Sequence, residues 1–221
     1  MAERRHPGGP LVDAGRPPGR VAPRTSLSSL PNLLAVARIA ATPVVFLLTV
    51  VDWPAAGMSA ALIFAAAAVT DFLDGRIARA RRAVSPLGVF LDLAADKVLV
   101  AGALVALVQV GLLPGWVAAA ILIREFVVQA VRQLAAAEDV VIAARGLGKA
   151  KTLLTLVGIW VLLLARDASS GGPLAAVGIG PVLAVAGAWL MVLAAAVTVV
   201  SGVLYLAAAW PMLAGDEPEA R

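Results

Sequence analysis

Six long apolar stretches follow one another along the chain and predict six helices. They are separated by residues that break helices, above all Pro54, Gly111 with Pro114, and the cluster from Ser169 to Pro173. A helix needs about 20 apolar residues to cross a bilayer, and each stretch comes close to that length or exceeds it. The stretches cover residues 32–51, 55–75, 87–109, 113–135, 148–166 and 178–210. We therefore expect an all-α, polytopic membrane protein with six transmembrane helices.

The last stretch leaves an alternative open. Apolar character continues from Pro173 to Leu213, which is too long for one straight span. Gly178, Gly180 and Pro181 are expected to mark where the helix begins. Two short spans in this region would instead place the C-terminus on the opposite side of the membrane.

Composition supports the membrane class. Hydrophobic residues make up 61% of the 221 positions and charged residues 14%, with a mean hydropathy of +0.94. In a soluble domain roughly a quarter of the residues are charged. Residues 1–28 are polar and rich in Arg, Pro and Gly, which predicts a disordered basic tail. The chain thus divides into this tail, a membrane domain at 29–213 and a C-terminal tail at 214–221.

The placement of the cations predicts the orientation. With a cytoplasmic N-terminus, fourteen Lys and Arg residues fall in the tails and in the second-to-third and fourth-to-fifth connections, whereas Arg166 alone falls outside. This bias follows the positive-inside rule. We therefore expect a multi-pass protein of the cell (inner) membrane, with both termini on the cytoplasmic side and a polar cavity open to the cytoplasm. No nucleic-acid partner is expected.

The residue inventory restricts the chemistry. The chain has no cysteine, which excludes disulfides, thiolate nucleophiles and cysteine-ligated metals. Its single histidine, His6, lies in the N-terminal tail, which argues against histidine acid–base chemistry and a histidine-ligated metal. Carboxylates, Arg, Lys, hydroxyls and amides remain.

Four aspartates lie in or beside two of the apolar stretches. Asp71 and Asp74 are three residues apart, and Asp92 and Asp96 are four apart, so each pair shares a helix face. A short turn between the two helices would let the four carboxylates converge. Such anions need compensation in a low dielectric, and oxygen ligands without imidazole or thiolate select a hard ion such as Mg²⁺ or Mn²⁺. Four carboxylates could hold two divalent ions.

The simpler explanation makes each aspartate a helix cap or a partner of a nearby arginine. Four intramembrane carboxylates at this spacing favour function, because such groups are costly in a bilayer. Gly75, Ala78 and Gly88 are small where a ligand would approach the backbone, and Arg79 could pair with a phosphate. Alone, these four would indicate helix packing and a membrane-anchoring arginine. Beside the aspartates they suggest a phosphorylated ligand.

The whole pattern resembles the signature of the CDP-alcohol phosphotransferase family. It reads Asp71-x2-Asp74-Gly75-x2-Ala78-Arg79-x8-Gly88-x3-Asp92-x3-Asp96. The resemblance implies a six-helix membrane enzyme that displaces CMP from a CDP-linked substrate, binds two divalent metals and forms a homodimer. It implies that the four aspartates are metal ligands, that Asp92 and Asp96 are catalytic, and that Asp96 is the general base. Gly75, Ala78, Arg79 and Gly88 would line the CDP site.

Shorter segments of the sequence indicate which alcohol accepts the phosphatidyl group. Pro31-Asn32-Leu33-Leu34 followed by Arg38, the pair Arg124-Glu125, and the run from Gly146 to Thr152 resemble bacterial phosphatidylglycerophosphate synthases. Asn32 would sit at the CDP site, although its position also suits a helix N-cap. The cations expected to bind the acceptor phosphate are Arg124, Arg132, Lys149 and Lys151. Structural Arg–Glu pairing and positive-inside topology are the alternatives for these residues. Leu93 stands where relatives often have proline.

The sequence therefore predicts transfer of a phosphatidyl group from CDP-diacylglycerol to sn-glycerol 3-phosphate at the inner leaflet. The same signature would also suit a cardiolipin synthase, with phosphatidylglycerol as acceptor, or a phosphatidylinositol phosphate synthase. A cation-coupled transporter would explain the four aspartates, but not the small residues and the arginine at fixed spacing. An inactive scaffold is a further possibility, but no motif position is damaged.

Overall fold

A computed structural model gives the backbone of residues 30–81, 86–138, 140 and 147–214, to which all structural statements refer. Within these ranges, the side chains of 30–31, 71–81, 86–89, 92 and 147 lie outside the description. The described backbone is helical, without strands. Its elements are α1 (Leu30–Val50), α2 (Ala56–Arg81), α3 (Pro86–Gln109), α4 (Gly115–Ala137), α5 (Leu147–Ser169), the 3₁₀ turn η1 (Ala175–Val177) and α6 (Gly180–Ala214). The six predicted helices are confirmed.

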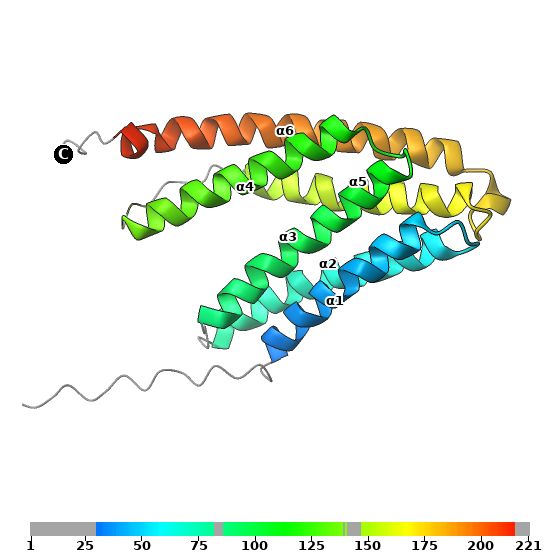
Figure 1. The fold of residues 1–221 in the computed structure, drawn as a ribbon, viewed down its shortest axis with the longest axis horizontal. Helices are drawn as coiled ribbons and strands as arrows, with labels where there is room; N and C mark the ends of the chain where they lie inside the picture. The colour runs from blue at the N-terminus through cyan, green and yellow to red at the C-terminus, as the bar shows by residue number, and fades with distance from the viewer. Residues whose placement is uncertain (1–29, 82–85, 139, 141–146, 215–221) are drawn as a thin grey trace, which may run out of the picture.

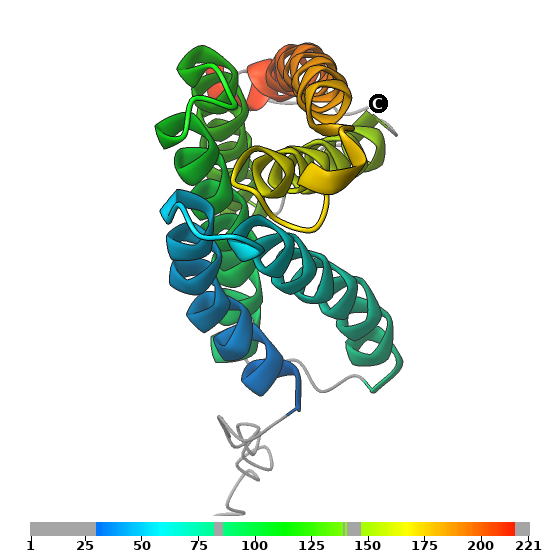
Figure 2. The same ribbon diagram turned by 90° about the vertical axis from the view of Figure 1, so that its right-hand side faces the viewer.

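The helices pack as two neighbouring groups. α1 lies against both α2 and α3, and α6 lies against both α4 and α5 (Figure 1). The contact between α2 and α5 joins the two groups. Figure 2 shows the same division from the side, with α1 and α2 on one side of the bundle and α5 and α6 on the other.

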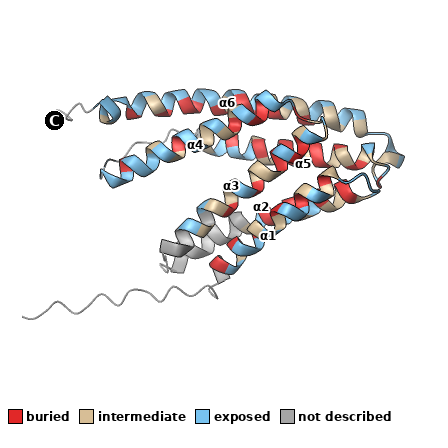
Figure 3. Ribbon diagram, in the orientation of Figure 1, coloured by how far each residue is buried: buried red, intermediate tan, exposed pale blue. Residues whose placement is uncertain are grey.

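Three of the described helices are long and apolar enough to cross a membrane, judged by length and composition. They cover Asn32–Val50, Gly148–Ser169 and Gly180–Ala214. α4 carries Arg124, Glu125 and Arg132 within its apolar sequence, which lowers its hydropathy. The membrane character of the chain is clear, because large apolar side chains such as Leu47, Leu62 and Val182 are exposed on the outside of the bundle (Figure 3).

The C-terminal apolar region forms one helix. Gly178 ends the 3₁₀ turn in the left-handed conformation, with φ of 72°, and α6 begins at Gly180. The helix then continues for 35 residues to Ala214, with Pro211 inside its last turn. At about 1.5 Å per residue it is about 52 Å long. The expectation of a helix start at Gly178–Pro181 is confirmed, and the alternative of two short helices is wrong.

The apolar core lies in one half of the bundle, and all six helices contribute to it. Phe64, Leu104, Ile121, Leu162 and Met191 are buried members from five of them. These residues come from the second half of each odd-numbered helix and the first half of each even-numbered helix. Because neighbouring helices alternate in direction, both sets fall at the same end. The opposite end is left for polar residues.

Small residues let α5 and α6 approach closely. A Cβ placed on Gly187 of α6 would lie 2.6 Å from Cδ2 of Leu162, and one on Gly158 of α5 would lie 2.6 Å from Sδ of Met191. Both distances are shorter than a normal van der Waals contact, so an alanine at either position would displace the side chain opposite it. Membrane helices depend on such close packing because lipid provides no hydrophobic drive between them.

Asp167 connects neighbouring segments at the end of the bundle where the core lies. Its fully buried carboxylate accepts hydrogen bonds from the backbone N–H of Met58, at 3.1 Å, and of Leu174, at 3.0 Å. The first bond satisfies an open N–H in the first turn of α2. Beside it, the guanidinium Nε of Arg166 donates to the carbonyl of Thr49 at 2.9 Å. One short segment of α5 thereby fixes the connection between α1 and α2.

Candidate active site

A polar cavity of about 440 Å³ opens between four helices at the end of the bundle away from the core. α3 contributes Lys97, and α4, α5 and α6 contribute the rest of the wall. The lining residues are Lys97, Arg124, Glu125, Val128, Gln129, Arg132, Gly148, Lys151, Thr152, Ser201, Leu204, Tyr205, Ala207 and Ala208. Four of them are cations, whereas Glu125 is the only carboxylate among them, so the wall has a formal charge of 4 − 1 = +3.

Glu125 is the centre of the charge network. One carboxylate oxygen contacts Nζ of Lys97, and the other contacts Nζ of Lys151 and lies 3.1 Å from NH1 of Arg124. The Glu125 side chain is only 16% exposed. Three cations from α3, α4 and α5 therefore share one largely buried anion. This arrangement lets the cations lie close together despite their mutual repulsion.

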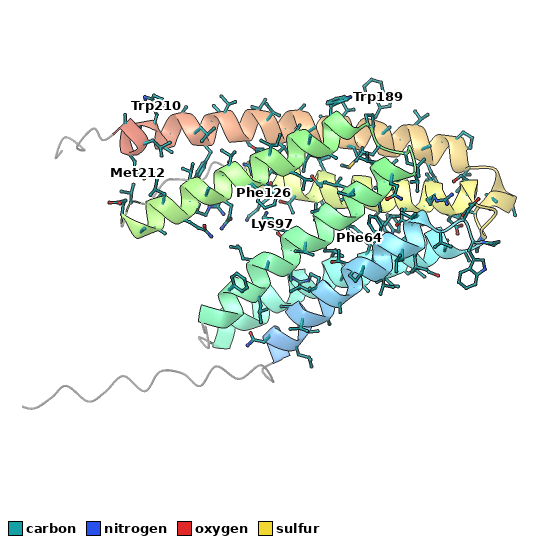
Figure 4. All side chains as sticks on the ribbon, viewed as in Figure 1. Phe64, Lys97, Phe126, Trp189, Trp210 and Met212 are labelled. Carbon is teal, nitrogen blue, oxygen red and sulfur yellow. The ribbon has the colours of Figure 1, made fainter. Side chains whose placement is uncertain are left out.

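The cavity adjoins one of the four predicted metal ligands. Nζ of Lys97 lies 3.5 Å from Oδ2 of Asp96, so this lysine stands between Asp96 and Glu125. A smaller cavity of about 40 Å³ is lined by both Asp96 and Lys97, and also by Glu125 and Lys151. In Figure 4, Lys97 lies where α3 passes α4 and α5. Asp96 is thus on the edge of the cation-lined space.

α6 completes the wall of the cavity. NH2 of Arg124 donates to Oγ of Ser201 at 3.1 Å. The guanidinium of Arg132 lies over the ring of Tyr205, 5.8 Å from its centroid, within the range of a cation–π interaction. Both arginines are therefore in contact with the same face of the last helix.

The structure brings three of the four predicted acceptor-binding cations together. Arg124, Arg132 and Lys151 all line the large cavity. Lys149 does not: it is exposed and lies outside the lining residues. The two lysines are two positions apart on a helix, so they point in different directions. Asn32 is buried at the start of α1 and is also not a lining residue.

The structure describes only some of the residues predicted to form the metal and CDP sites. α2 carries Asp71 and Asp74, and α3 carries Asp92 and Asp96. The side chains of the first three, and those of Gly75, Ala78, Arg79 and Gly88, lie outside the described residues. The Asp96 side chain is described and is 43% exposed. All four candidate ligands offer only carboxylate oxygens, the donor set that suits Mg²⁺ or Mn²⁺.

Sequence reasoning missed several residues of this cavity. Lys97 was not among the predicted site residues, and Glu125 was considered only as a member of the pair Arg124-Glu125. Ser201 and Tyr205 were not singled out, since the last apolar stretch showed no charged residue. A signal was present, however: Ser201 and Tyr205 are four positions apart, the spacing that places two residues on one helix face.

The fold and the site together define a helical membrane protein with a cation-lined cavity, and the sequence comparisons specify its family. The CDP-alcohol phosphatidyltransferase family model matches residues 28–209. The chain belongs to this family, as the aspartate signature predicted.

Named relatives cover most of the chain. A CDP-diacylglycerol–glycerol-3-phosphate 3-phosphatidyltransferase of Bacillus subtilis is 39% identical over 148 residues, covering 62% of this chain and 77% of that protein. A probable phosphatidylglycerophosphate synthase of Mycobacterium tuberculosis is 37% identical over 202 residues and covers 90% of both chains. A CMP-forming cardiolipin synthase of Oryza sativa is 35% identical over 205 residues, covering 86% of this chain and 60% of that protein.

Proposed function

We propose that this protein transfers the phosphatidyl group of CDP-diacylglycerol to sn-glycerol 3-phosphate, giving phosphatidylglycerophosphate and CMP. The observation that carries the proposal is the cavity beside Asp96, whose wall contains Lys97, Arg124, Arg132 and Lys151 but only one carboxylate, Glu125. The relatives from B. subtilis and M. tuberculosis, whose names refer to this reaction or its product, support it.

The charge of the cavity suits a phosphate monoester. Such a group carries about −1.5 to −2 at neutral pH and offers three acceptor oxygens. The lining has a formal charge of +3, so a dianion would compensate most of it. A volume of about 440 Å³ lies at the lower end of the range for small-molecule sites, which extends from about 300 to 1,000 Å³. Glycerol 3-phosphate has the charge and the small size that this space requires.

Cardiolipin synthesis is the second candidate, supported by the relative from O. sativa. Its acceptor, phosphatidylglycerol, is a phosphodiester with one negative charge, and it would leave more of the four cations uncompensated. Inositol phosphate is a monoester like glycerol 3-phosphate and shares its charge. The three acceptors must therefore be compared directly.

The reaction fits an in-line displacement. The acceptor hydroxyl forms a bond to the β-phosphorus of the CDP group, the bond to the CMP oxygen breaks, and the hydroxyl proton passes to a carboxylate, for which we propose Asp96. Nζ of Lys97 lies 3.5 Å from the Asp96 carboxylate and connects it to the cation-lined cavity. The basic cavity next to Asp96 would hold the acceptor phosphate and direct its hydroxyl toward the diphosphate.

The proposal includes two divalent ions, Mg²⁺ or Mn²⁺, held by Asp71, Asp74, Asp92 and Asp96. When bound, these ions supply charge neutralisation at the diphosphate. The proposed CDP contacts are Asn32, Gly75, Ala78, Arg79 and Gly88. We further propose six membrane spans, a homodimer, and an active site on the cytoplasmic side of the cell membrane, where the water-soluble acceptor and the water-soluble product CMP are found.

The first test is CMP release by the purified protein in detergent with CDP-diacylglycerol and Mg²⁺. Glycerol 3-phosphate, phosphatidylglycerol and inositol phosphate are offered separately. Release with glycerol 3-phosphate alone is the expected result, and release only with another acceptor would refute the choice of acceptor. Metal-dependent CMP release of any kind excludes a pure cation transporter.

Two variants test the catalytic carboxylates. Asp92→Asn and Asp96→Asn should abolish turnover while the protein keeps its thermal stability and elution volume. Asp52→Asn is the matched control, because Asp52 is exposed at the core end of the bundle, and it should leave turnover intact. Full activity of Asp96→Asn would refute the role of this residue as the base.

A further inference from the structure

Arg124 reaches the cavity from α4 but is held in place by α6. Its NH2 donates to Oγ of Ser201 at 3.1 Å, and Oγ of Ser201 in turn donates to the backbone carbonyl of Thr198 at 3.0 Å. Because the second bond fixes the hydroxyl hydrogen on the carbonyl, a lone pair of the same oxygen is directed at the arginine. Ser201 is buried, so this geometry is shielded from water.

Gly202 provides the space through which the arginine passes. A Cβ at this position would lie 2.7 Å from Cγ of Arg124, 3.6 Å from Cδ and 3.4 Å from Nε. The aliphatic stem of Arg124 therefore lies directly on the backbone of α6 at Gly202. Any side chain there would push the stem away from α6 and move the guanidinium.

The other end of the guanidinium is fixed as well. NH1 of Arg124 lies 3.1 Å from the carboxylate of Glu125, on the opposite side of the group from Ser201. An unrestrained arginine loses rotamer entropy when it binds a ligand. Contacts from two helices remove most of this freedom before a ligand arrives. The guanidinium is then held at the wall of the cavity, where its remaining N–H groups could bind a phosphate.

We propose that Ser201 and Gly202 are positioning residues that direct Arg124 toward the phosphate of the acceptor. The inference rests on the proposed function, since it assigns the basic cavity to a phosphorylated acceptor. It gives the last helix a part in acceptor recognition. Tyr205, one turn further along α6, holds Arg132 in the same way through its ring.

The test separates acceptor binding from donor binding. Ser201→Ala removes the hydroxyl without adding volume, and Gly202→Ala adds the methyl group that meets the Arg124 stem. Each should raise the KM for glycerol 3-phosphate by roughly tenfold, the effect of losing one hydrogen bond to a charged group. The KM for CDP-diacylglycerol should stay within about twofold, because the contacts that the structure describes for these two residues are with Arg124 and with α6 itself.

Two matched controls lie on the same helix. Thr198→Val removes another buried hydroxyl, whose Oγ1 has no hydrogen-bond partner among the described residues. Gly187→Ala crowds Leu162 of α5 instead of Arg124. Thr198→Val should leave both KM values unchanged. Gly187→Ala should lower the melting temperature without raising the KM for the acceptor more than that for the donor.

Thermal shift gives a readout that does not require turnover. Glycerol 3-phosphate should raise the melting temperature of the wild type and of Thr198→Val, and should do so less for Ser201→Ala. Equal shifts in all three proteins, or equal rises in both KM values, would overturn the positioning role. If the wild type turns over only with inositol phosphate, the proposed acceptor is wrong, and the same comparison with that acceptor still decides the role of Ser201.

Discussion

Replacing Glu125 with glutamine should destabilise the protein, because this carboxylate holds three cations together. Glutamine keeps the size and hydrogen-bonding reach of the side chain but removes its charge. Lys97, Arg124 and Lys151 would then face one another, and Arg132 in the same cavity, without the anion that now lies between them. Lys151 and Arg124 are only 10% and 12% exposed, so water can screen them little.

The magnitude follows from the burial of these groups. Removing one partner of a fully buried ion pair costs about 3–5 kcal/mol. Glu125 is 16% exposed and lies beside an open cavity, which places the expected loss near the lower limit, at about 3 kcal/mol. For a chain of this size, 1 kcal/mol corresponds to about 2–4 °C in melting temperature, so Glu125→Gln should melt about 6–12 °C below the wild type.

The assay is thermal unfolding in detergent, followed by the fluorescence of the five tryptophans. Inorganic phosphate provides the decisive comparison. It should raise the melting temperature of Glu125→Gln more than that of the wild type, because it replaces the missing negative charge. Glu138→Gln is the control, since this carboxylate is exposed at the end of the same helix. A Glu125→Gln protein that melts within about 2 °C of the wild type, or gains no more from phosphate, would refute this account of the cavity.

Three further outcomes are expected. Lys151→Met should raise the KM for the acceptor by roughly tenfold or more, while Lys149→Met should change it little, because only Lys151 lines the cavity; steady-state CMP release measures both. Asp167→Ala should lower the melting temperature by about 6–12 °C, because it removes two hydrogen bonds to a buried carboxylate. The control Asp52→Ala removes a largely exposed ion pair and should lower the melting temperature by less than about 3 °C. Chelation with EDTA should abolish CMP release, and either Mg²⁺ or Mn²⁺ should restore it; activity that persists in EDTA would refute the proposed metal site.

Hydropathy was sufficient to predict the helices. Each of the six stretches corresponds to one helix, because the hydrophobic run and the Pro or Gly that ends it are both local features. The main difference is at α2, which continues to Arg81 although the predicted stretch ended at residue 75. The charged residues from Asp71 to Arg81 lower hydropathy without interrupting helical hydrogen bonding. Hydropathy therefore reports the apolar part of a helix rather than its full length.

The composition of the cavity was harder to predict, because it depends on contacts between distant residues. Lys97 meets Glu125 across 28 positions of sequence, and Arg124 meets Ser201 across 77. Periodicity shows which side of its own helix a residue occupies, but not which helix will lie opposite. The cations could be singled out as candidate phosphate ligands because charged groups inside an apolar stretch are unusual. A serine and a glycine in such a stretch are ordinary residues, and only the position of Arg124 gives them a role.

The bundle has an apolar half, which holds the core, and a polar half, which holds the cation-lined cavity. The polar half depends on the apolar half. Four cations within one cavity repel one another and would separate if their helices could move apart. At the opposite end the buried core, the close contacts at Gly158 and Gly187, and the Asp167 carboxylate fix those same helices. That packing lets Glu125, together with Asp96 beside Lys97, hold the basic side chains close together with a surplus of positive charge in the cavity wall. The surplus is what a phosphorylated acceptor would neutralise, so the anion affinity that we expect of the cavity would have its origin in the apolar half of the fold.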